Sequence, residues 1–522
     1  MTNKLLLTTL LISSFLNAKA QKTNPNELNF LLESQNATPI LPHHITKKEQ
    51  KALNTEQNYE LQFFPQKFVI QLPDIKPVQL PIENKTKNYT TYLTFSYGNY
   101  SSLVGELFVS KKTKNTLFGS KINYLTIGKG DVALQTNTEL QGRIFGDVFL
   151  ENWTIRNALN MSLQGFYFYG NTNESLTEKA LKQKFEKIVL QNDFQETNTL
   201  TDWQLEGKNE LYFWKDLKNH QENILKNRTS FSYQFSKKEK IGIGNESFID
   251  FRKKSFIQQN SLFYGYQTSN YSIETSAGLA FDKLNYLGNA FKFLPKIVLK
   301  YSLIPEKMQV RLQVSNAYQY ATYEQFTQTN NFLEVDSLQH SFKPLIVQTG
   351  INYNFNGIAF FEASYHYEKI QNKAFFVNRA DNFGFFELLY DDVLLHQFFF
   401  KSSLKHQNLY LSAQFTQKFF QLNRLEAPYH EALQSYEINA DYKLKKWAFR
   451  LHFLYLSTIY YRHKSSNLLP NPLNLDFYTD FRVHKNVLLY SEAKNIFSQN
   501  YSYYYAYPNR EAQFLGGLKV LF

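Results

Sequence analysis

The chain has 522 residues, no cysteine, a formal net charge of +12 and a mean hydropathy of −0.43. The lack of cysteine excludes disulfides, cysteine-bound metals and a lipoprotein export signal, which needs a cysteine at its cleavage point. Phe and Tyr raise the aromatic content to 17% although the chain is polar on average. This combination is typical of a membrane β-barrel, where aromatic residues gather at the lipid interfaces and half of each strand faces water.

The first 20 residues have the three parts of a secretory signal peptide. Lys4 supplies the positive start, 5–16 is apolar apart from Thr and Ser, and Ala18-Lys19-Ala20 is a small-x-small cleavage site. No later segment approaches the roughly 18 consecutive apolar residues of a membrane-spanning helix. We therefore expect export, cleavage after Ala20 and a multi-pass location in the outer membrane of a Gram-negative cell.

Residues 21–88 differ from the rest of the chain. They are rich in Asn, Gln, Lys and Pro, they show no period, and 73–81 is stiffened by prolines. So few apolar residues make a poor core, so a separate folded domain is not expected. We expect an irregular periplasmic or lumen-occupying segment, in which 74–88 runs through or along the lumen.

From Tyr89 to Phe522 the side chains alternate with the period of two that strands require. Leu93, Phe95 and Tyr97, for example, alternate with polar or less apolar neighbours. The alternating segments have roughly the 10-residue length that a tilted strand needs to cross a bilayer. The sequence predicts an all-β fold, a transmembrane antiparallel β-barrel over 89–522 with about 20 strands, within a range of 16 to 22.

The connections alternate in length, as they do when short turns face the periplasm and long loops face outward. This alternation holds only if 384–405 is one long strand despite Asp391-Asp392. The short turns are expected near 268–270, 305–307, 356–357, 405–407, 445–446 and 484–486. The long loops are expected near 323–341, 371–384, 421–431, 461–471 and 499–510.

One loop has the pattern of a helix. Residues 175–178 form a capping box of the type Ser-x-x-Glu. Apolar residues follow at helical spacing, namely Ala180, Leu181, Phe185, Ile188 and Val189. We expect a helix here that packs on neighbouring loops, outside the cell or folded into the lumen.

The sequence contains no catalytic or metal-binding motif of a known enzyme class. Asp392 and His396 share a strand face, but a rise of about 3.3 Å per residue separates them by roughly 13 Å, beyond the reach of an acid–base pair. His43-His44 lies in the irregular segment and is interpreted as solvated. We expect no enzyme and no cofactor; an outer-membrane protease or lipase stays open as an alternative because cross-strand pairing can assemble a site.

Alternation also predicts which charges face the lumen. The candidate lining residues are Lys300, Arg311, Arg450, His452 and Lys519. Such cations select solutes by charge, and the basic chain as a whole suits anionic solutes or the headgroups of outer-membrane lipid and lipopolysaccharide. The alternative is that lumen charges pair with acids on neighbouring strands and that the remaining lysines are spread over the rim.

The last strand alternates to the final residue. Phe514, Gly516, Leu518, Val520 and Phe522 lie on one face, and Leu515, Gly517, Lys519 and Leu521 lie on the other. A strand that closes on an aromatic residue is what an outer-membrane barrel presents to the barrel assembly machinery. We interpret Gly517, Val520 and Phe522 as this assembly signal.

The end of the chain resembles the barrel of TonB-dependent receptors. The resemblance rests on Asn495-Ile496-Phe497, Tyr501, Tyr507-Pro508, Arg510, Gly516 and Phe522, and on the preceding 475–482. It implies that Asn495, Phe497, Tyr507, Pro508 and Arg510 build the family's final hairpin. Such receptors carry a longer plug domain and an energy-coupling box where this chain has 21–88, so the chain resembles plugless, receptor-like barrels.

A barrel of this size needs something to narrow it, because 16 to 18 strands already leave an aqueous channel. The favoured function is a transport conduit or partner-gated pore of unknown substrate. The alternative is a filled scaffold that binds surface lipoproteins or other outer-membrane proteins. The expected partners are lipid, the assembly machinery, surface lipoproteins or a separate gating protein, and not nucleic acid.

Overall fold

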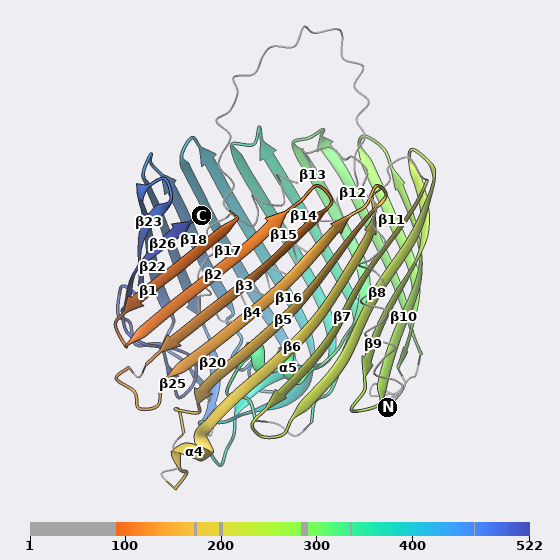
Figure 1. The fold of residues 1–522 in the computed structure, drawn as a ribbon. Helices are drawn as coiled ribbons and strands as arrows, with labels where there is room; N and C mark the ends of the chain where they lie inside the picture. The colour runs from red at the N-terminus through yellow and green to blue at the C-terminus, as the bar shows by residue number, and fades with distance from the viewer. Residues whose placement is uncertain are drawn as a thin grey trace, which may run out of the picture.

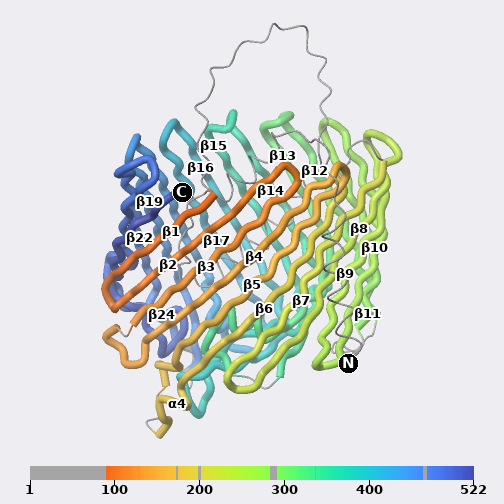
Figure 2. The backbone as a smooth tube through the Cα atoms, in the orientation of Figure 1, coloured from red at the N-terminus to blue at the C-terminus, as the bar shows by residue number. Residues whose placement is uncertain are grey.

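The computed structural model describes residues 90–128, 130–171, 175–197, 202–282, 291–334, 337–463 and 465–522. Within these residues, 22 strands form one antiparallel sheet that closes on itself where β1 pairs with β26. The strands run at a slant around a barrel wall, and the first strands lie beside the last ones (Figures 1 and 2). Closure leaves no free sheet edge, which a barrel in lipid requires because hydrocarbon offers backbone groups no partner.

The barrel strands follow one another around the wall in chain order. The first eleven are β1 (Thr91–Gly98), β2 (Ser102–Lys112), β3 (Thr116–Ile127), β4 (Asn137–Phe149), β5 (Trp153–Tyr167), β6 (Lys182–Glu196), β7 (Trp203–Asp216), β8 (Gln221–Ser236), β9 (Glu239–Asp250), β10 (Ser255–Gln267) and β11 (Tyr271–Asp282). The others are β12 (Phe291–Ile304), β13 (Met308–Gln319), β14 (Ser341–Phe355), β15 (Ala359–Asn378), β16 (Phe386–His406), β17 (Leu409–Leu422), β18 (Gln434–Lys443), β19 (Trp447–Ser457), β22 (Leu473–His484), β23 (Val487–Lys494) and β26 (Gln513–Leu521).

The two faces of the wall follow the predicted alternation. In β1 the side chains of Leu93, Phe95 and Tyr97 are exposed on the outer face, whereas Tyr92, Thr94 and Ser96, which alternate with them, are buried. An outer face of this kind suits lipid, and an inner face of small and polar side chains suits a lumen. The all-β barrel predicted from the sequence is confirmed, with 22 strands rather than about 20, at the top of the expected range.

Short turns and long loops alternate between the two ends of the barrel. The turns after β10, β12, β14, β16, β18 and β22 are short, as predicted, and they lie at the end that also holds the C-terminus. The long loops lie at the opposite end, with α4 (Glu178–Leu181), α5 (Tyr323–Thr329), β20 (Tyr460–His463), β21 (Ser465–Leu468), β24 (Ser502–Tyr504) and β25 (Tyr507–Pro508) (Figure 1). We call these the short-turn end and the long-loop end.

The expectation that 384–405 is a single strand is confirmed by β16. The carboxylate of Asp391 is fully buried in this strand and accepts the backbone N–H groups of Asn423, Arg424 and Leu425 at 3.0, 2.9 and 3.0 Å. The carboxylate therefore stabilises the start of the loop after β17. This role explains why a charge lies inside a strand.

The predicted helix over 175–189 is wrong beyond Leu181. Thr177, not Ser175, caps the single helical turn α4 by accepting the N–H of Ala180, and the chain then enters β6. In β6 Val189 is buried on the inner face while Ile188 is exposed on the outer face. A strand with apolar residues on both faces can show the same spacing as the apolar face of a helix. Here pairing of β6 with β5 and β7 outweighs the local helical pattern.

The signal peptide, the irregular segment 21–88 and the predicted path of 74–88 lie outside the described residues. Neither helix of the described residues is long and apolar enough to cross a bilayer.

Candidate functional site

Apolar side chains from two loops, 320–340 and 495–512, meet at the long-loop end. They meet inward-facing residues of the barrel wall in one continuous cluster, which we call the mouth cluster. Its buried members are Phe166, Phe185, Val189, Tyr212, Trp214, Ile224, Phe248, Ala321, Tyr323, Leu333, Leu338, Phe386, Leu388 and Tyr507. Burial of this many large side chains stabilises the closed arrangement, at about 25 cal/mol per Å² of apolar surface.

Tyr507 joins the two loops inside the mouth cluster. Its ring stacks on Phe332 with centroids 3.4 Å apart and planes inclined by 11°, and it meets Tyr169 edge-on at 4.9 Å. Its hydroxyl donates to the carbonyl of Gly384, in the loop after β15. Burial raises the pKa of Tyr507 well above its ordinary value, so the hydroxyl keeps the proton that it donates.

Two glycines allow the backbones of these loops to approach. A Cβ atom on Gly384 would lie 2.6 Å from Cα of Asn171, and one on Gly170 would lie 2.6 Å from the carbonyl oxygen of Ala506. Both contacts are with backbone, which cannot move aside as a side chain does. Any side chain at these two positions would therefore push the loops apart.

The loop 320–340 is fixed to the wall by buried polar contacts. The carboxylate of Glu222 in β8 accepts the N–H groups of Tyr323 and Glu324 at 2.6 and 3.1 Å, and Lys187 in β6 pairs with Glu324 at 2.6 Å. The Nδ1 atom of His340 accepts the N–H of Ala321 at 3.0 Å. Burial lowers the pKa of His340 to about 4, which leaves the ring neutral at pH 7 as this bond requires.

Asn495 holds the base of the loop 495–512. Its φ of 47° lies in the left-handed region, which Asn tolerates better than most residues. Its side-chain amide donates to the carbonyls of Gln499 and Arg510 at 3.2 and 2.9 Å, and its backbone N–H donates to Asp476 in β22 at 3.0 Å. One asparagine thus joins both ends of the loop to the wall.

The other residues of the predicted final hairpin take different positions. The Arg510 guanidinium donates to the carbonyls of Gln135 and Gly128, and burial lowers its pKa. The carbonyl of Pro508 accepts the side-chain amide of Gln135 at 2.7 Å. Phe497 is 53% exposed and makes no part of the mouth cluster. The structure therefore brings Asn495, Tyr507, Pro508 and Arg510 together and leaves Phe497 apart.

Charged residues join three loops at the rim of the mouth cluster. Glu334 pairs with Lys218, from the turn between β7 and β8, and with Arg379, from the loop after β15, at 3.4 Å. Arg379 also pairs with Asp381 at 2.7 Å. These pairs are partly exposed, so each contributes little to stability, but together they hold the loops in register.

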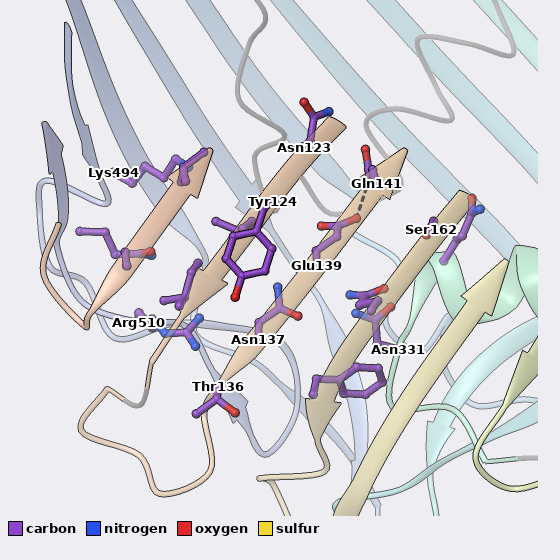
Figure 3. A pocket seen from close by; sticks show the side chains of 18 of the residues that line it. Asn123, Tyr124, Thr136, Asn137, Glu139, Gln141, Ser162, Asn331, Lys494 and Arg510 are labelled. Atoms are coloured by element: carbon purple, nitrogen blue, oxygen red, sulfur yellow. Dashed lines mark hydrogen bonds between the residues drawn. The ribbon is translucent and has the colours of Figure 1, made fainter. Parts of the chain in front are cut away.

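A cavity of about 770 Å³ lies in the lumen beneath the mouth cluster. We call it the chamber. Inward-facing side chains of neighbouring strands, among them Asn123, Gln141 and Ser162, form one wall, and Asn331 and Arg510 reach it from the loops (Figure 3). Amide side chains and apolar side chains both lie on its wall, and aromatic side chains lie where the loops meet it.

Two of the predicted lining cations lie side by side. Lys300 in β12 is opposite Arg311 in β13, and the Arg311 guanidinium donates to Gln313 at 2.8 Å. Lys519 in β26 lies over the ring of Tyr92, with its Nζ atom 4.2 Å from the centroid.

The other two candidates are paired with acids on neighbouring strands. Arg450 lies 3.3 Å from Asp441 and 3.9 Å from Asp480. His452 lies between Glu437 and Asp476, at 3.5 and 3.6 Å. None of the five candidates lines the chamber, so a role in selecting solutes elsewhere in the lumen stays a prediction.

The residues of the predicted assembly signal lie in the closing strand. A Cβ atom on Gly517 would lie 2.5 Å from the carbonyl oxygen of Phe95, so the β1–β26 pairing requires glycine there. Phe522 is 62% exposed, and its N–H donates to the carbonyl of Thr91 at 2.8 Å. Recognition of Gly517, Val520 and Phe522 by the assembly machinery stays a prediction.

Sequence reasoning missed most residues of the mouth cluster and the chamber. It identified 323–341 and 499–510 as long loops, but not that Tyr504 would donate to the carbonyl of Thr329 at 2.5 Å. The available signal was the density of aromatic residues in those two loops, such as Tyr501, Tyr503, Tyr504 and Tyr505.

Comparisons with known proteins show what this fold is similar to. No protein-family model matches the sequence, and a comparison with curated proteins finds no relative. Among solved structures, the FrpB iron transporter from Neisseria meningitidis is similar with a TM-score of 0.64 at 9% identity, covering 84% of this chain and 82% of that one.

Two further structures give the same result. The ferric-catecholate import receptor Fiu from E. coli K12 is similar with a TM-score of 0.61 at 11% identity, covering 84% of this chain and 82% of that one. The copper transporter OprC is similar with a TM-score of 0.60 at 10% identity, covering 83% and 80%. The chain therefore has the barrel fold of TonB-dependent receptors, as its C-terminal residues predicted, while the lack of a plug stays a prediction because 1–89 lies outside the described residues.

Proposed function

We propose that this protein is an outer-membrane transport barrel whose passage is closed at the cell surface by the mouth cluster. The long-loop end faces outward and the short-turn end faces the periplasm, by the rule that bacterial barrels follow. Solute enters when the loops 320–340 and 495–512 separate. The lumen then selects by its width and by the charges that line it.

The observation that carries this proposal is the chamber, with its many amide side chains, beneath the packed side chains of the mouth cluster. The closure depends on side-chain contacts between loops, such as Tyr507 with Phe332, and not on pairing within the barrel sheet. Loops held by such contacts open at a lower free-energy cost than the barrel wall does. The mouth can therefore open while the wall stays folded.

The scaffold alternative differs in what it requires of the lumen. A barrel that serves only to display its loops has no use for a polar chamber under them. The fold of the neighbours, which are transporters and import receptors by name, also favours transport.

Planar-bilayer conductance tests the proposal. The wild-type full chain should conduct weakly and intermittently, and Tyr507→Ala should give larger and longer openings because it removes the contact between the loops. Phe497→Ala is the matched control, since this aromatic residue of the same loop is exposed. Conductance that is equally absent from all three proteins, with lipoproteins that co-purify, would instead establish a scaffold.

A further inference from the structure

The wall of the chamber is unusually rich in amides. Thirteen of the residues that line it are Asn or Gln, and apolar side chains such as Ile127, Phe166 and Val189 lie among them. Several amides form a chain of contacts across strands, as Asn160 donates to Gln191 at 3.1 Å and Gln191 donates to Glu210 at 3.4 Å. The lining amides are Asn123, Gln135, Asn137, Gln141, Asn160, Gln164, Gln191, Gln328, Asn331, Asn474, Asn495, Asn509 and Gln513.

The charges of the chamber cancel. Five lining residues are acidic and five are basic, so the formal charge of the lining is zero. Two pairs are close: Lys121 lies 2.7 Å from Glu106, and Lys494 lies 2.6 Å from Glu492. Because the formal charges of the lining sum to zero, the chamber presents little net field to a solute.

Aromatic rings form the side of the chamber that the loops close. Tyr501 and Tyr503 of the loop 495–512 meet edge-on with centroids 5.2 Å apart, and Phe332 reaches the same side from the loop 320–340. The rings of Tyr501 and Tyr503 combine an apolar face with a polar hydroxyl, whereas the ring of Phe332 is apolar throughout.

We propose that the chamber binds a neutral, polyhydroxylated ligand, namely an oligosaccharide. Each amide both donates and accepts, so a row of amides complements hydroxyl groups, which also do both. Asn123, Gln141 and Ser162 lie on adjacent strands about 4.8 Å apart, a repeat comparable to that of linked sugar rings. The tyrosine and phenylalanine rings suit the C–H faces of sugars. This inference names the solute of the transport function proposed above and rests on it.

Other ligand classes fit the chamber less well. An anionic metal chelate would need an excess of positive charge, and a cationic solute would need an excess of negative charge, yet the lining is balanced. An apolar solute would displace water from the wall amides and offer them no hydrogen bond, at a cost of about 1–3 kcal/mol for each group that stays unpaired. A neutral solute with many hydroxyl groups matches the amides and leaves the ion pairs in place.

Calorimetric titration of the purified full chain tests the ligand class. The probes are maltohexaose, which is neutral, an oligogalacturonate of equal length, which is anionic, and a chitosan oligomer, which is cationic at pH 6. Maltohexaose should bind at least about tenfold more tightly than either charged chain, a difference of about 1.4 kcal/mol. Its Kd should stay within about twofold between low and high salt, since no net charge is neutralised. Preference for the anionic chain, or no binding of any probe, would overturn the proposal.

Variants locate the site. Asn123→Leu with Gln141→Leu should raise the Kd of maltohexaose about tenfold, because two buried hydrogen-bonding groups are lost. Gln348→Leu is the control, an amide in β14 that does not line the chamber. Asn331→Ala, in a loop, should also raise the Kd, and it changes the chamber without touching the barrel wall. Equal affinity in the control and in both chamber variants would contradict the assignment.

Conductance separates this inference from the proposed function. If Tyr507→Ala opens the pore but maltohexaose neither binds nor blocks it, the ligand class is wrong and the transport proposal stands. If maltohexaose binds the chamber but no variant conducts, the transport proposal is wrong and the binding site stands.

Discussion

The ring of Tyr507 lies on the ring of Phe332, with centroids 3.4 Å apart and planes inclined by 11°. These residues belong to loops that are far apart in the chain, and their contact brings the loop before the last strand over the loop before β14. The two loops pack together in the mouth cluster where these rings meet.

Replacement of Tyr507 by Ala should open the mouth. Loss of a buried aromatic ring costs about 3–5 kcal/mol in a packed core, and here the loss falls on the loop contact and not on the wall. Hydrogen exchange in 320–334 and 499–510 should accelerate at least about a hundredfold, which corresponds to about 2.7 kcal/mol. Exchange in the barrel strands should stay unchanged, and Phe497→Ala should match the wild type throughout.

Replacement of Asn495 by Gly should destabilise the loop 495–512 less than replacement by Ala does. Asn495→Gly keeps the left-handed backbone and loses two hydrogen bonds, at about 1–2 kcal/mol. Asn495→Ala loses the same bonds and adds a strained Cβ at a φ of 47°, for a further 1 kcal/mol or so. The rate of proteolysis within 495–512 measures both. Equal rates for the two variants would show that the backbone conformation contributes nothing.

Asp391 should be needed for the loop that follows β17. Asp391→Asn removes the charge that accepts the backbone N–H groups of Asn423, Arg424 and Leu425, with an expected loss of about 2–3 kcal/mol in the local opening free energy. Asp392→Asn is the neighbouring control, because its exposed carboxylate accepts one backbone N–H group of the described residues, that of Asn372, at 2.8 Å. Hydrogen exchange of 423–433 should rise in the first variant far more than in the second.

The docking of the loop 320–340 should weaken in acid through His340. Its pKa is lowered to about 4 in the closed loop, so below its ordinary value of about 6.5 the opened loop binds a proton that the closed loop excludes. The contribution of His340 to the docking of the loop is therefore complete above pH 6.5 and is lost as the pH falls toward 4. Between pH 7 and pH 5 the loss is about 2 kcal/mol.

The control variant, His340→Asn, keeps a side-chain hydrogen-bond acceptor at this position and removes the ring that titrates. His340→Asn should make hydrogen exchange of 320–334 nearly independent of pH over this interval, after correction for the intrinsic exchange rate. His484→Asn, at the exposed last residue of β22 at the short-turn end, should behave as the wild type does. A pH dependence that survives in His340→Asn would assign it to another group.

The sequence was sufficient to predict the barrel wall but not the mouth cluster. Alternation predicted the outer and inner faces of β1, and the parity of the turns predicted that β16 crosses without a break. These are local signals, because a strand in lipid must alternate and neighbouring strands must be joined on one side or the other. The strand count stayed near 20 because weak patterns in the first half of the chain hid individual strands.

The mouth depends on pairings between distant loops, which no local period encodes. Asn495 and Tyr507 were identified by resemblance, but their partners Gln499, Gly384 and Phe332 were not. The false helix at 175–189 has the same origin, since only pairing with β5 and β7 shows that Phe185 and Ile188 point to opposite faces of a strand. The chamber was beyond prediction for this reason too.

The most direct test of the central claim is thiol labelling of the chamber in intact cells. The chain has no cysteine, so Gln141→Cys places a single thiol on the chamber wall. A bulky, membrane-impermeant maleimide added outside should label it slowly in the otherwise wild-type protein and at least about a hundredfold faster when Tyr507→Ala is added. Equally fast labelling with and without Tyr507→Ala would show that the mouth cluster does not close the barrel.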